Sequence, residues 1–166
     1  PRGPTRRFSV FSRTGGNWNF ETFPSPDSTP PEQVLVFSGG VNLVVEGLGQ
    51  SVGGQQVDTL DLSADRIVVW TDPVSSQNFS GSADQSSDLP LQVYLEGNIV
   101  IRQGGNVLRA AQAFYDVREQ RALLNNAELK TQIEGFPAKV RVLASQLRQL
   151  APNTYQASNA AITTSD

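Results

Sequence analysis

Three closely spaced aspartates are the residues whose type and spacing come nearest to a catalytic or metal-binding set. Asp58, Asp61 and Asp65 could ligate a divalent cation or act as an acid–base group. They are interleaved with Leu60 and Leu62, which a strand would turn toward the interior. We therefore interpret the three carboxylates as solvent-facing, and we predict neither a metal nor a catalytic residue among them.

A glycine-rich segment has some of the character of a phosphate-binding loop. The residues from Gly47 to Gly53 lack the spacing GxGxxG, and strand-like sequence lies on both sides of them. We interpret the segment as part of a hairpin connection over Gly47–Gly54.

Four arginines near the N-terminus have two interpretations. Arg2, Arg6, Arg7 and Arg13 could meet the phosphates of an anionic lipid. We favour the second interpretation, in which they are solvated charges that protect a strand edge from aggregation.

The composition excludes most catalytic chemistry. The 166 residues include 13 Lys or Arg and 16 Asp or Glu, which gives a net charge of −3, and there is no His or Cys. Histidine general bases, cysteine nucleophiles, thiolate or imidazole zinc sites and disulfides are therefore excluded. The weakly acidic balance argues against a nucleic-acid partner. No apolar run reaches the roughly 18 residues of a membrane-spanning helix. We predict a protein that is not an enzyme and has no cofactor.

Apolar and polar residues alternate along most of the chain, which indicates an all-β fold. In the segment Gln92–Arg102, Val93, Ile99 and Ile101 share one face, whereas Val100 lies on the other. The same alternation predicts strands at Arg7–Ser12, Trp18–Phe23, Val34–Glu46, Val57–Thr71, Gln92–Arg102, Val107–Tyr115, Ala122–Ile133, Val140–Leu150 and Thr154–Thr164.

Three segments depart from simple alternation. Pro24–Pro31 predicts a proline-rich linker, and the Ser-, Asp- and Gln-rich segment Ser75–Asp88 predicts a mobile loop. For Asn106–Leu124, which is rich in Ala, Leu, Arg and Gln, a helix remains an alternative to a strand. We divide the chain into an N-terminal extension, residues 1–31, which can add strands, and a β domain, residues 32–166.

A six-residue motif occurs three times in the chain. Leu62–Ile67, Leu108–Ala113 and Val142–Leu147 all read apolar, any residue, Ala, two mostly polar residues, apolar. Inside each motif the alternation of apolar and polar residues shifts by one position, so the apolar residues before and after the shift would point to opposite faces of a regular strand. An extra residue at that point, a β-bulge, would return both apolar pairs to one face and would bend the strand. The repetition predicts stacked strands that share a corner.

The segment Leu95–Gly104, followed by Val107–Asp116, resembles the OstA-like repeat of lipopolysaccharide-transport proteins. That family includes the periplasmic bridge protein LptA, the bridge domain of LptC and the periplasmic N-terminal domain of LptD. The resemblance rests on the pattern G-N-[IV]-x-[IV]-x-Q-G and the apolar-x-Ala word after it, and it covers about Val34–Asp166. The Ser75–Asp88 insertion and the N-terminal extension favour a domain of a larger LptD-like or multi-repeat protein.

The resemblance implies a folded-over antiparallel sheet, the β-jellyroll or β-taco, with an apolar groove for the acyl chains of lipopolysaccharide. It further implies a periplasmic location, which allows tethering to the outer membrane as part of a larger protein, stacking against other OstA-like domains, and self-association. The residues expected to line the groove are Leu35, Phe37, Val41, Leu43, Leu62, Ala64, Val93, Leu95, Ile99, Ile101, Leu108, Ala110, Val142 and Ala144.

Two alternatives to this function stay open. The same inward-facing residues could form the core of a closed sandwich, in a module that assembles through its sheet edges without lipid. A carbohydrate-binding jelly roll would want exposed aromatic platforms, and the chain has only two tryptophans, Trp18 and Trp70.

Overall fold

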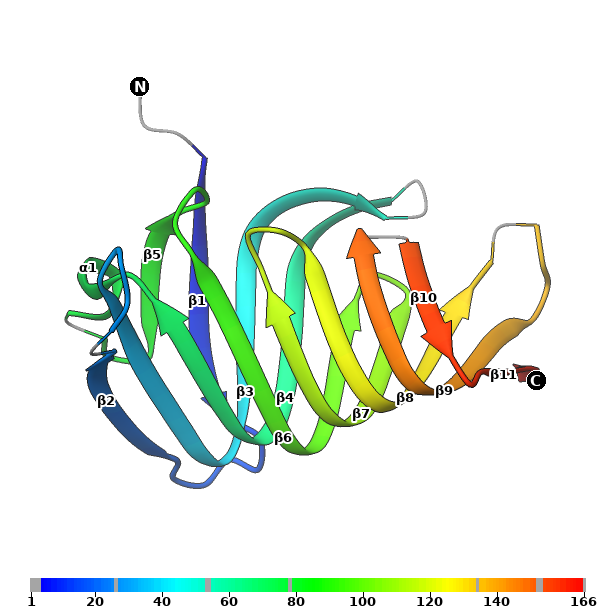
Figure 1. Cartoon of the computed structure of the whole chain (residues 1–166), viewed down its shortest axis with the longest axis horizontal. Helices are drawn as coiled ribbons and strands as arrows, with labels where there is room; N and C mark the ends of the chain where they lie inside the picture. Colours follow the sequence, from blue (N-terminus) through cyan, green and yellow to red (C-terminus); the bar gives the residue numbers. More distant parts are fainter. Residues whose placement is uncertain are drawn as a thin grey trace.

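The computed structural model describes residues 4–25, 27–52, 55–77, 79–133, 135–151 and 154–165. Apart from one short helix, the regular structure in these residues is strand, so the predicted all-β class is confirmed (Figure 1). The elements are β1 Thr5–Ser12, β2 Asn19–Ser25, β3 Glu32–Val52, β4 Gln55–Thr71, α1 Pro73–Ser76, β5 Ser82–Ser86, β6 Leu91–Gln103, β7 Asn106–Asp116, β8 Arg121–Gln132, β9 Lys139–Ala151, β10 Thr154–Ser158 and β11 Ala161–Ser165.

The strands form one antiparallel sheet that is not closed into a barrel. Its order is β10-β9-β8-β7-β6-β4-β3-β1-β5, with β11 also paired to β9 and β2 also paired to β3. The long strands bend together along the lower side of Figure 1. On one side of the bend β1 pairs with residues 41–46 of β3, and β11 with residues 139–143 of β9. On the other side β2 and β10 take the corresponding edges. We call these two sides the β1 half and the β2 half.

The two halves face each other across a common core. In β6, Val93 and Leu95 lie before the bend and Ile99 and Ile101 after it, and all four are at most 2% exposed. An isolated sheet leaves its apolar face in water, so complete burial on both sides of the bend requires the halves to cover each other. The sheet is thus folded over, as predicted.

Strands that run from the β2 half to the β1 half turn the corner with Gly or Asn. These residues have positive φ, which Gly adopts without strain and Asn tolerates better than most residues. They are Gly39 and Gly40 in β3, Gly97 and Asn98 in β6, Asn126 in β8, and Asn159 between β10 and β11. The strand expected over Thr154–Thr164 is therefore split into β10 and β11, because the returning chain follows the corner of β9.

Strands that run in the opposite direction turn the corner with the repeated six-residue motif that contains Ala, which we call the Ala word. The three words lie in β4, β7 and β9, and the apolar residues on both sides of each shift are buried or packed against the core. The predicted repeated corner is confirmed, but the extra residue is in the neighbouring strands β3 and β6, and β9 shows no such shift against β8. Ser38 pairs with Arg66 and Val41 with Ala64, so β3 has one residue more than β4 at the corner. The extra residue of β6 relative to β4 and β7 lies between Glu96 and Ile99.

Two sequence predictions were wrong, and one alternative that the sequence left open is excluded. The helical alternative for Asn106–Leu124 is excluded, because β7 pairs with β6 and β8 throughout. Ser75–Asp88 contains the end of α1 and the strand β5, which pairs with β1. The connection expected over Gly47–Gly54 is mostly strand, since β3 continues to Val52 after an irregularity between Glu46 and Gln50. The tip of that hairpin, residues 53 and 54, lies outside the described residues.

We predict that Gly97→Ala destabilises the fold by about 1–3 kcal/mol. Gly97 has φ +80°, and an added Cβ would lie 2.5 Å from a carboxylate oxygen of Asp65 in the neighbouring corner. The control is Gly105→Ala in the β6–β7 turn, where no heavy atom lies within 4 Å of an added Cβ. Urea unfolding should show a change of less than about 0.5 kcal/mol for the control. Equal effects of the two substitutions would contradict the importance of the corner.

Candidate functional site

All fourteen predicted lining residues face the interior of the folded sheet. From Leu35 to Ile101 each is at most 2% exposed, so these side chains pack against one another and are shielded from water. Ala110 in β7 and Val142 in β9 are partly exposed, although both pack against the core. The interior is therefore closely packed through β3, β4 and β6 and less covered toward β9.

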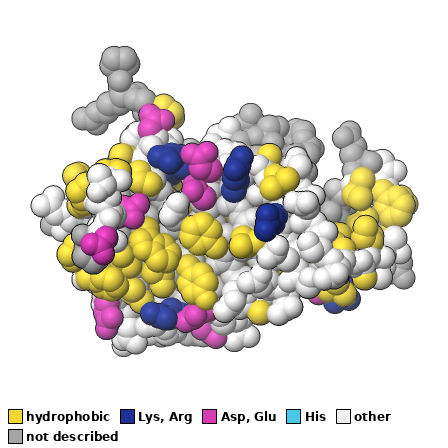
Figure 2. Space-filling view, viewed as in Figure 1, with side chains coloured by type: hydrophobic (Ala, Val, Ile, Leu, Met, Phe, Trp, Pro, Cys, Tyr) yellow, Lys and Arg dark blue, Asp and Glu magenta, His cyan; other side chains and the backbone are white. Residues whose placement is uncertain are grey.

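An aromatic cluster closes the interior at the β1–β2 end. The ring of Phe79, from the chain between α1 and β5, stacks on Phe8 at 5.7 Å and contacts Phe20 and Phe37 at 5.6 Å. Phe8 belongs to the β1 half, whereas Phe20 and Phe37 belong to the β2 half, so Phe79 packs between the two halves. Hydrophobic side chains also gather on the surface of this end, around α1 and β2 (Figure 2).

A buried arginine joins the halves on the side opposite the corners. Arg6 of β1 is 3% exposed, and its guanidinium donates to Gln85 Oε1 at 2.8 Å and to the carbonyls of Ser87 and Leu89. The Gln85 amide in turn donates to the hydroxyl of Thr71, at the end of β4 in the β2 half, at 2.7 Å. We call Arg6, Gln85, Thr71 and Asp72 the arginine cluster.

The charges around Arg6 explain why its guanidinium stays protonated. Desolvation, together with repulsion by Arg118, lowers the pKa of Arg6 to about 10, while Asp116, Asp72 and Asp88 act in the opposite direction. Burial raises the pKa of Asp72, but hydrogen bonds from Ser75, Gln85 and Thr71 outweigh that effect and hold the pKa below its usual value. The guanidinium thus remains charged at neutral pH.

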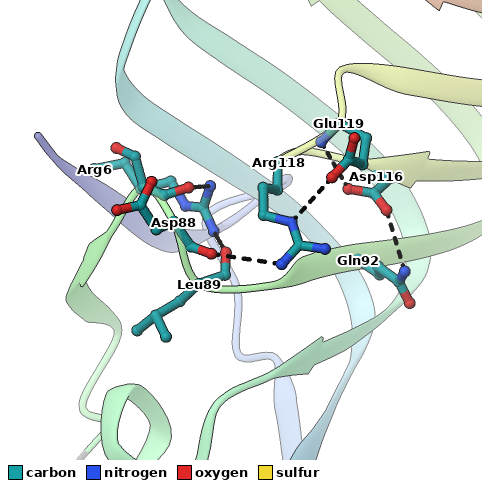
Figure 3. A network of polar contacts seen from close by, with 8 residues as sticks. Arg6, Asp88, Leu89, Gln92, Asp116, Arg118 and Glu119 are labelled. Carbon is teal, nitrogen blue, oxygen red and sulfur yellow. Dashed lines mark hydrogen bonds and ion pairs between the residues drawn. The ribbon is translucent and has the colours of Figure 1, made fainter.

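The turn between β7 and β8 extends this network (Figure 3). Arg118 pairs with Glu119 at 3.2 Å and donates to the carbonyl of Asp88 at 3.5 Å. Asp116 accepts from the Gln92 amide at 3.1 Å and from the backbone N–H of Glu119 at 3.0 Å. The chain that leaves β5 is thereby held against the β2 half.

A second, uncharged cluster joins the halves nearer the β9 end. The Tyr115 hydroxyl, in the β2 half, donates to Gln103 Oε1, in the β1 half, at 3.4 Å, and the Gln149 amide donates to the same oxygen at 3.4 Å. Nearby, Asn106 of the β1 half donates to the Tyr155 hydroxyl of β10 at 3.3 Å and accepts from Thr131 at 2.6 Å. We call Gln103, Asn106, Tyr115, Thr131, Gln149 and Tyr155 the tyrosine cluster.

The backbone reinforces the two clusters unequally. Beside the arginine cluster the chain crosses between the halves twice, from β4 to β5 and from β5 to β6. Beside the tyrosine cluster, each of the described turns joins strand segments of the same half, as Gly104–Gly105 does between β6 and β7. Among the described residues, the contacts that hold the halves together on this side at that end are therefore made by side chains.

The aspartates of the sequence analysis do not form a site. Asp58 accepts from the backbone N–H groups of Gly47 and Gly49, and Asp65 pairs with Arg13 at 3.0 Å. Asp61 accepts from Asn42 at 3.4 Å, and burial raises its pKa, partly offset by Arg102. Within the described ranges, no three or more His, Cys, Asp or Glu residues could hold a metal ion.

The four arginines have different environments. Arg6 is buried, so neither of the two interpretations holds for it. Arg7 pairs with Asp84 at 3.8 Å on the surface, as an edge charge would. Arg13 fixes the corners, with hydrogen bonds to Ser63, Asp65 and the Asn98 carbonyl. Arg2 lies outside the described residues.

The polar clusters were missed by the sequence analysis, although the sequence holds a signal for each of them. Gln103 continues the inward series of Ile99 and Ile101, and Gln149 does the same after Leu147. A polar residue at an inward position indicates a buried hydrogen-bonding group. Arg6 gave the same signal, since it precedes Phe8 and Val10 in the inward series of β1, but its partner Gln85 comes from a segment expected to be a loop.

Comparisons with protein-family models, curated proteins and solved structures found no match for this chain. In the part of the chain that the structure describes, none of the helical structure has the length and apolar character needed to cross a membrane.

We predict that alkaline pH weakens the fold through the tyrosine cluster. Burial raises the pKa of the Tyr115 hydroxyl above its ordinary value, with a further contribution from Tyr155, whose own pKa burial also raises. The folded state then keeps tyrosine protons that the unfolded state loses, so the contribution of these tyrosines to stability is intact below about pH 10 and falls as the pH rises further.

The measurement is urea unfolding between about pH 8.5 and 11.5. Each tyrosine contributes a slope of up to about 1.4 kcal/mol per pH unit above pH 10, and Tyr115→Phe should remove one such contribution. An unchanged slope in the variant would show that the Tyr115 hydroxyl is not held in its neutral form by the fold.

Proposed function

We propose that this protein binds the acyl chains of lipopolysaccharide, or of a similar glycolipid, between the two halves of its sheet. In this proposal it carries the lipid through the periplasm toward the outer membrane without catalysing a reaction. One observation carries the proposal: an apolar interior that continues across six bent strands and, in the described part of the chain, is held closed near β9 by contacts between side chains. The resemblance of Leu95–Gly104 and the following strand to the OstA-like repeat supports the choice of lipid.

The energetics favour such a protein for moving lipids across water. Burying a methylene group contributes about 0.8 kcal/mol, so exposing a twelve-carbon chain costs on the order of 9 kcal/mol. Successive strands present inward residues of similar type, such as Leu62, Ile101 and Leu108, which are neighbours in the sheet. An acyl chain would then move between positions of similar free energy, so no chemical step is needed.

Binding requires the halves to separate. The interior side chains from β3 to β6 are fully packed, and an acyl chain needs the space that they occupy. The end near β9, where Val142 is partly exposed, is where separation begins in this proposal. The acyl chain then packs against the apolar side chains that face each other in the closed structure, so these side chains stay out of water.

We predict that a small diazirine-bearing aliphatic residue at Ile101 captures lipid A, whereas the same residue at Val100 does not. Ile101 is 1% exposed and faces the interior, and its neighbour Val100 faces outward on the same strand. Illumination of the purified protein with lipid A, followed by mass spectrometry, measures the capture, and a melting curve confirms that each variant is folded. Equal capture at both positions, or none at Ile101 in a folded protein, would contradict the proposed function.

A module that assembles through its sheet edges without lipid is the second candidate. The complete packing of the interior through β3, β4 and β6 favours it, because a closed core needs no ligand. The outer edges of β2, β5, β10 and β11 are available for pairing with other chains within the described sheet. Sedimentation distinguishes the candidates: concentration-dependent assembly of a protein that takes up no lipid would favour this second function.

A further inference from the structure

The tyrosine cluster is an unusual feature of an interior that is mostly apolar. Gln103, Tyr115 and Gln149 are at most 2% exposed, and Asn106 is 6% exposed. Buried polar groups of this kind cost free energy unless they are hydrogen-bonded. In the closed structure they bond to one another across the two halves, through Gln103 Oε1 and the Tyr155 hydroxyl, and Tyr115 also interacts with Gln149 within the β2 half.

Separation of the halves breaks these particular hydrogen bonds. Tyr115, Gln149 and Tyr155 lie in the β2 half, whereas Gln103 and Asn106 lie in the β1 half. A ligand that holds the halves apart must therefore supply new partners to both sets, or leave them buried and unsatisfied. A pure hydrocarbon chain has no atoms to do so.

We infer that the tyrosine cluster is a binding subsite for the carbonyl linkage, ester or amide, through which an acyl chain is attached to its headgroup. This inference rests on the proposed function and defines the ligand more narrowly. The Tyr115 hydroxyl and the amides of Gln103 and Gln149 can donate to a carbonyl oxygen. An amide linkage can also donate to a side-chain carbonyl of the same cluster.

The chemistry of the cluster selects an uncharged linkage. Its described members are Gln, Asn, Tyr and Thr, so a phosphate or carboxylate placed there would find no cation among them. The buried guanidinium of Arg6 does not serve that purpose, because it is engaged by Gln85, Ser87 and Leu89 in the other cluster. Headgroup phosphates are thus expected to stay outside the interior.

The position of the cluster fits this role. It lies on the open side of the folded sheet, the side opposite the corners, at the end where the described turns do not connect the two halves. A ligand that enters there does not cross any described backbone segment. The apolar residues Ile101 and Leu108 follow directly inward from Gln103 and Asn106 along β6 and β7. A carbonyl bound at the cluster would place the attached acyl chain along these strands.

The experiment compares two nonionic detergents with the same chain length, below their critical micelle concentrations. Sucrose monododecanoate has an ester carbonyl, whereas dodecyl maltoside has a glycosidic linkage without a carbonyl in its place. The protein should bind the ester about fivefold more tightly, the difference that one hydrogen bond makes. Isothermal titration calorimetry measures both affinities.

A matched pair of variants locates the effect. Tyr115→Phe removes one hydroxyl from the cluster and should abolish most of the preference for the ester. Tyr94→Phe removes the same group from the outer face of β6, where it donates to Glu96, and should leave the preference unchanged.

The outcomes separate the two proposals. Equal affinities of the unmodified protein for both detergents, or a preference that survives in Tyr115→Phe, would overturn the subsite and leave the proposed function standing. The comparison on the unmodified protein holds even where Tyr115→Phe fails to fold. Failure to bind either detergent or lipid A would overturn the proposed function and the subsite together.

Discussion

The alignment of a bend in every long strand is the constraint on which the rest of this structure depends. A sheet of this width buries its apolar face only by folding over itself, and it folds only where all its strands turn at the same level. A bend displaced by one residue would turn the following side chains to the opposite face. Strand direction explains the two solutions: Gly or Asn at positive φ in one direction, as at Gly97, and the Ala word in the other, as at Ala64. Arg13 ties adjacent corners together through Asp65 and Asn98.

On the side opposite the corners, different contacts join the two halves at the two ends of the folded sheet. At the β1–β2 end, Phe79 fills the space between the halves, Gln85, which binds Arg6, donates across them to Thr71, and the chain crosses twice. Toward β9, the tyrosine cluster links the halves through neutral hydrogen bonds. Such bonds contribute about 1 kcal/mol each, whereas separating the other end would strand a buried guanidinium and several backbone carbonyls. The two ends therefore differ in the free energy needed to open them, and the proposed binding of lipid uses the weaker end.

Much of this fold was predictable because its determinants are local. Alternation along β6 identified both its extent and its inward face, and the three Ala words identified the corners. The errors arose where distant partners decide the structure. Ser82–Ser86 is polar and was expected to be a loop, yet it forms β5 because the edge of β1 offers hydrogen bonds and Arg6 offers a partner for Gln85. The register shifts belong to β3 and β6, and a shift is defined only against a neighbouring strand. Among the residues of the candidate site, the inward-facing apolar residues were predicted from the alternation of apolar and polar residues along each strand. The polar clusters depend on contacts between the two halves.

Separation of the halves at the β9 end, while the β1 end stays closed, is tested most directly by pairs of spin labels. The chain has no cysteine, so labels attach only where cysteines are introduced. One pair, at Gly105 and Glu119, spans the open side between the two turns of β7, and a second pair, at Asp84 and Val74, spans it beside β5 and α1. Pulsed electron paramagnetic resonance should show the first distance increasing on addition of lipid A and the second remaining unchanged. An unchanged first distance in a protein that has bound lipid A, or an equal increase in both, would contradict opening at the β9 end.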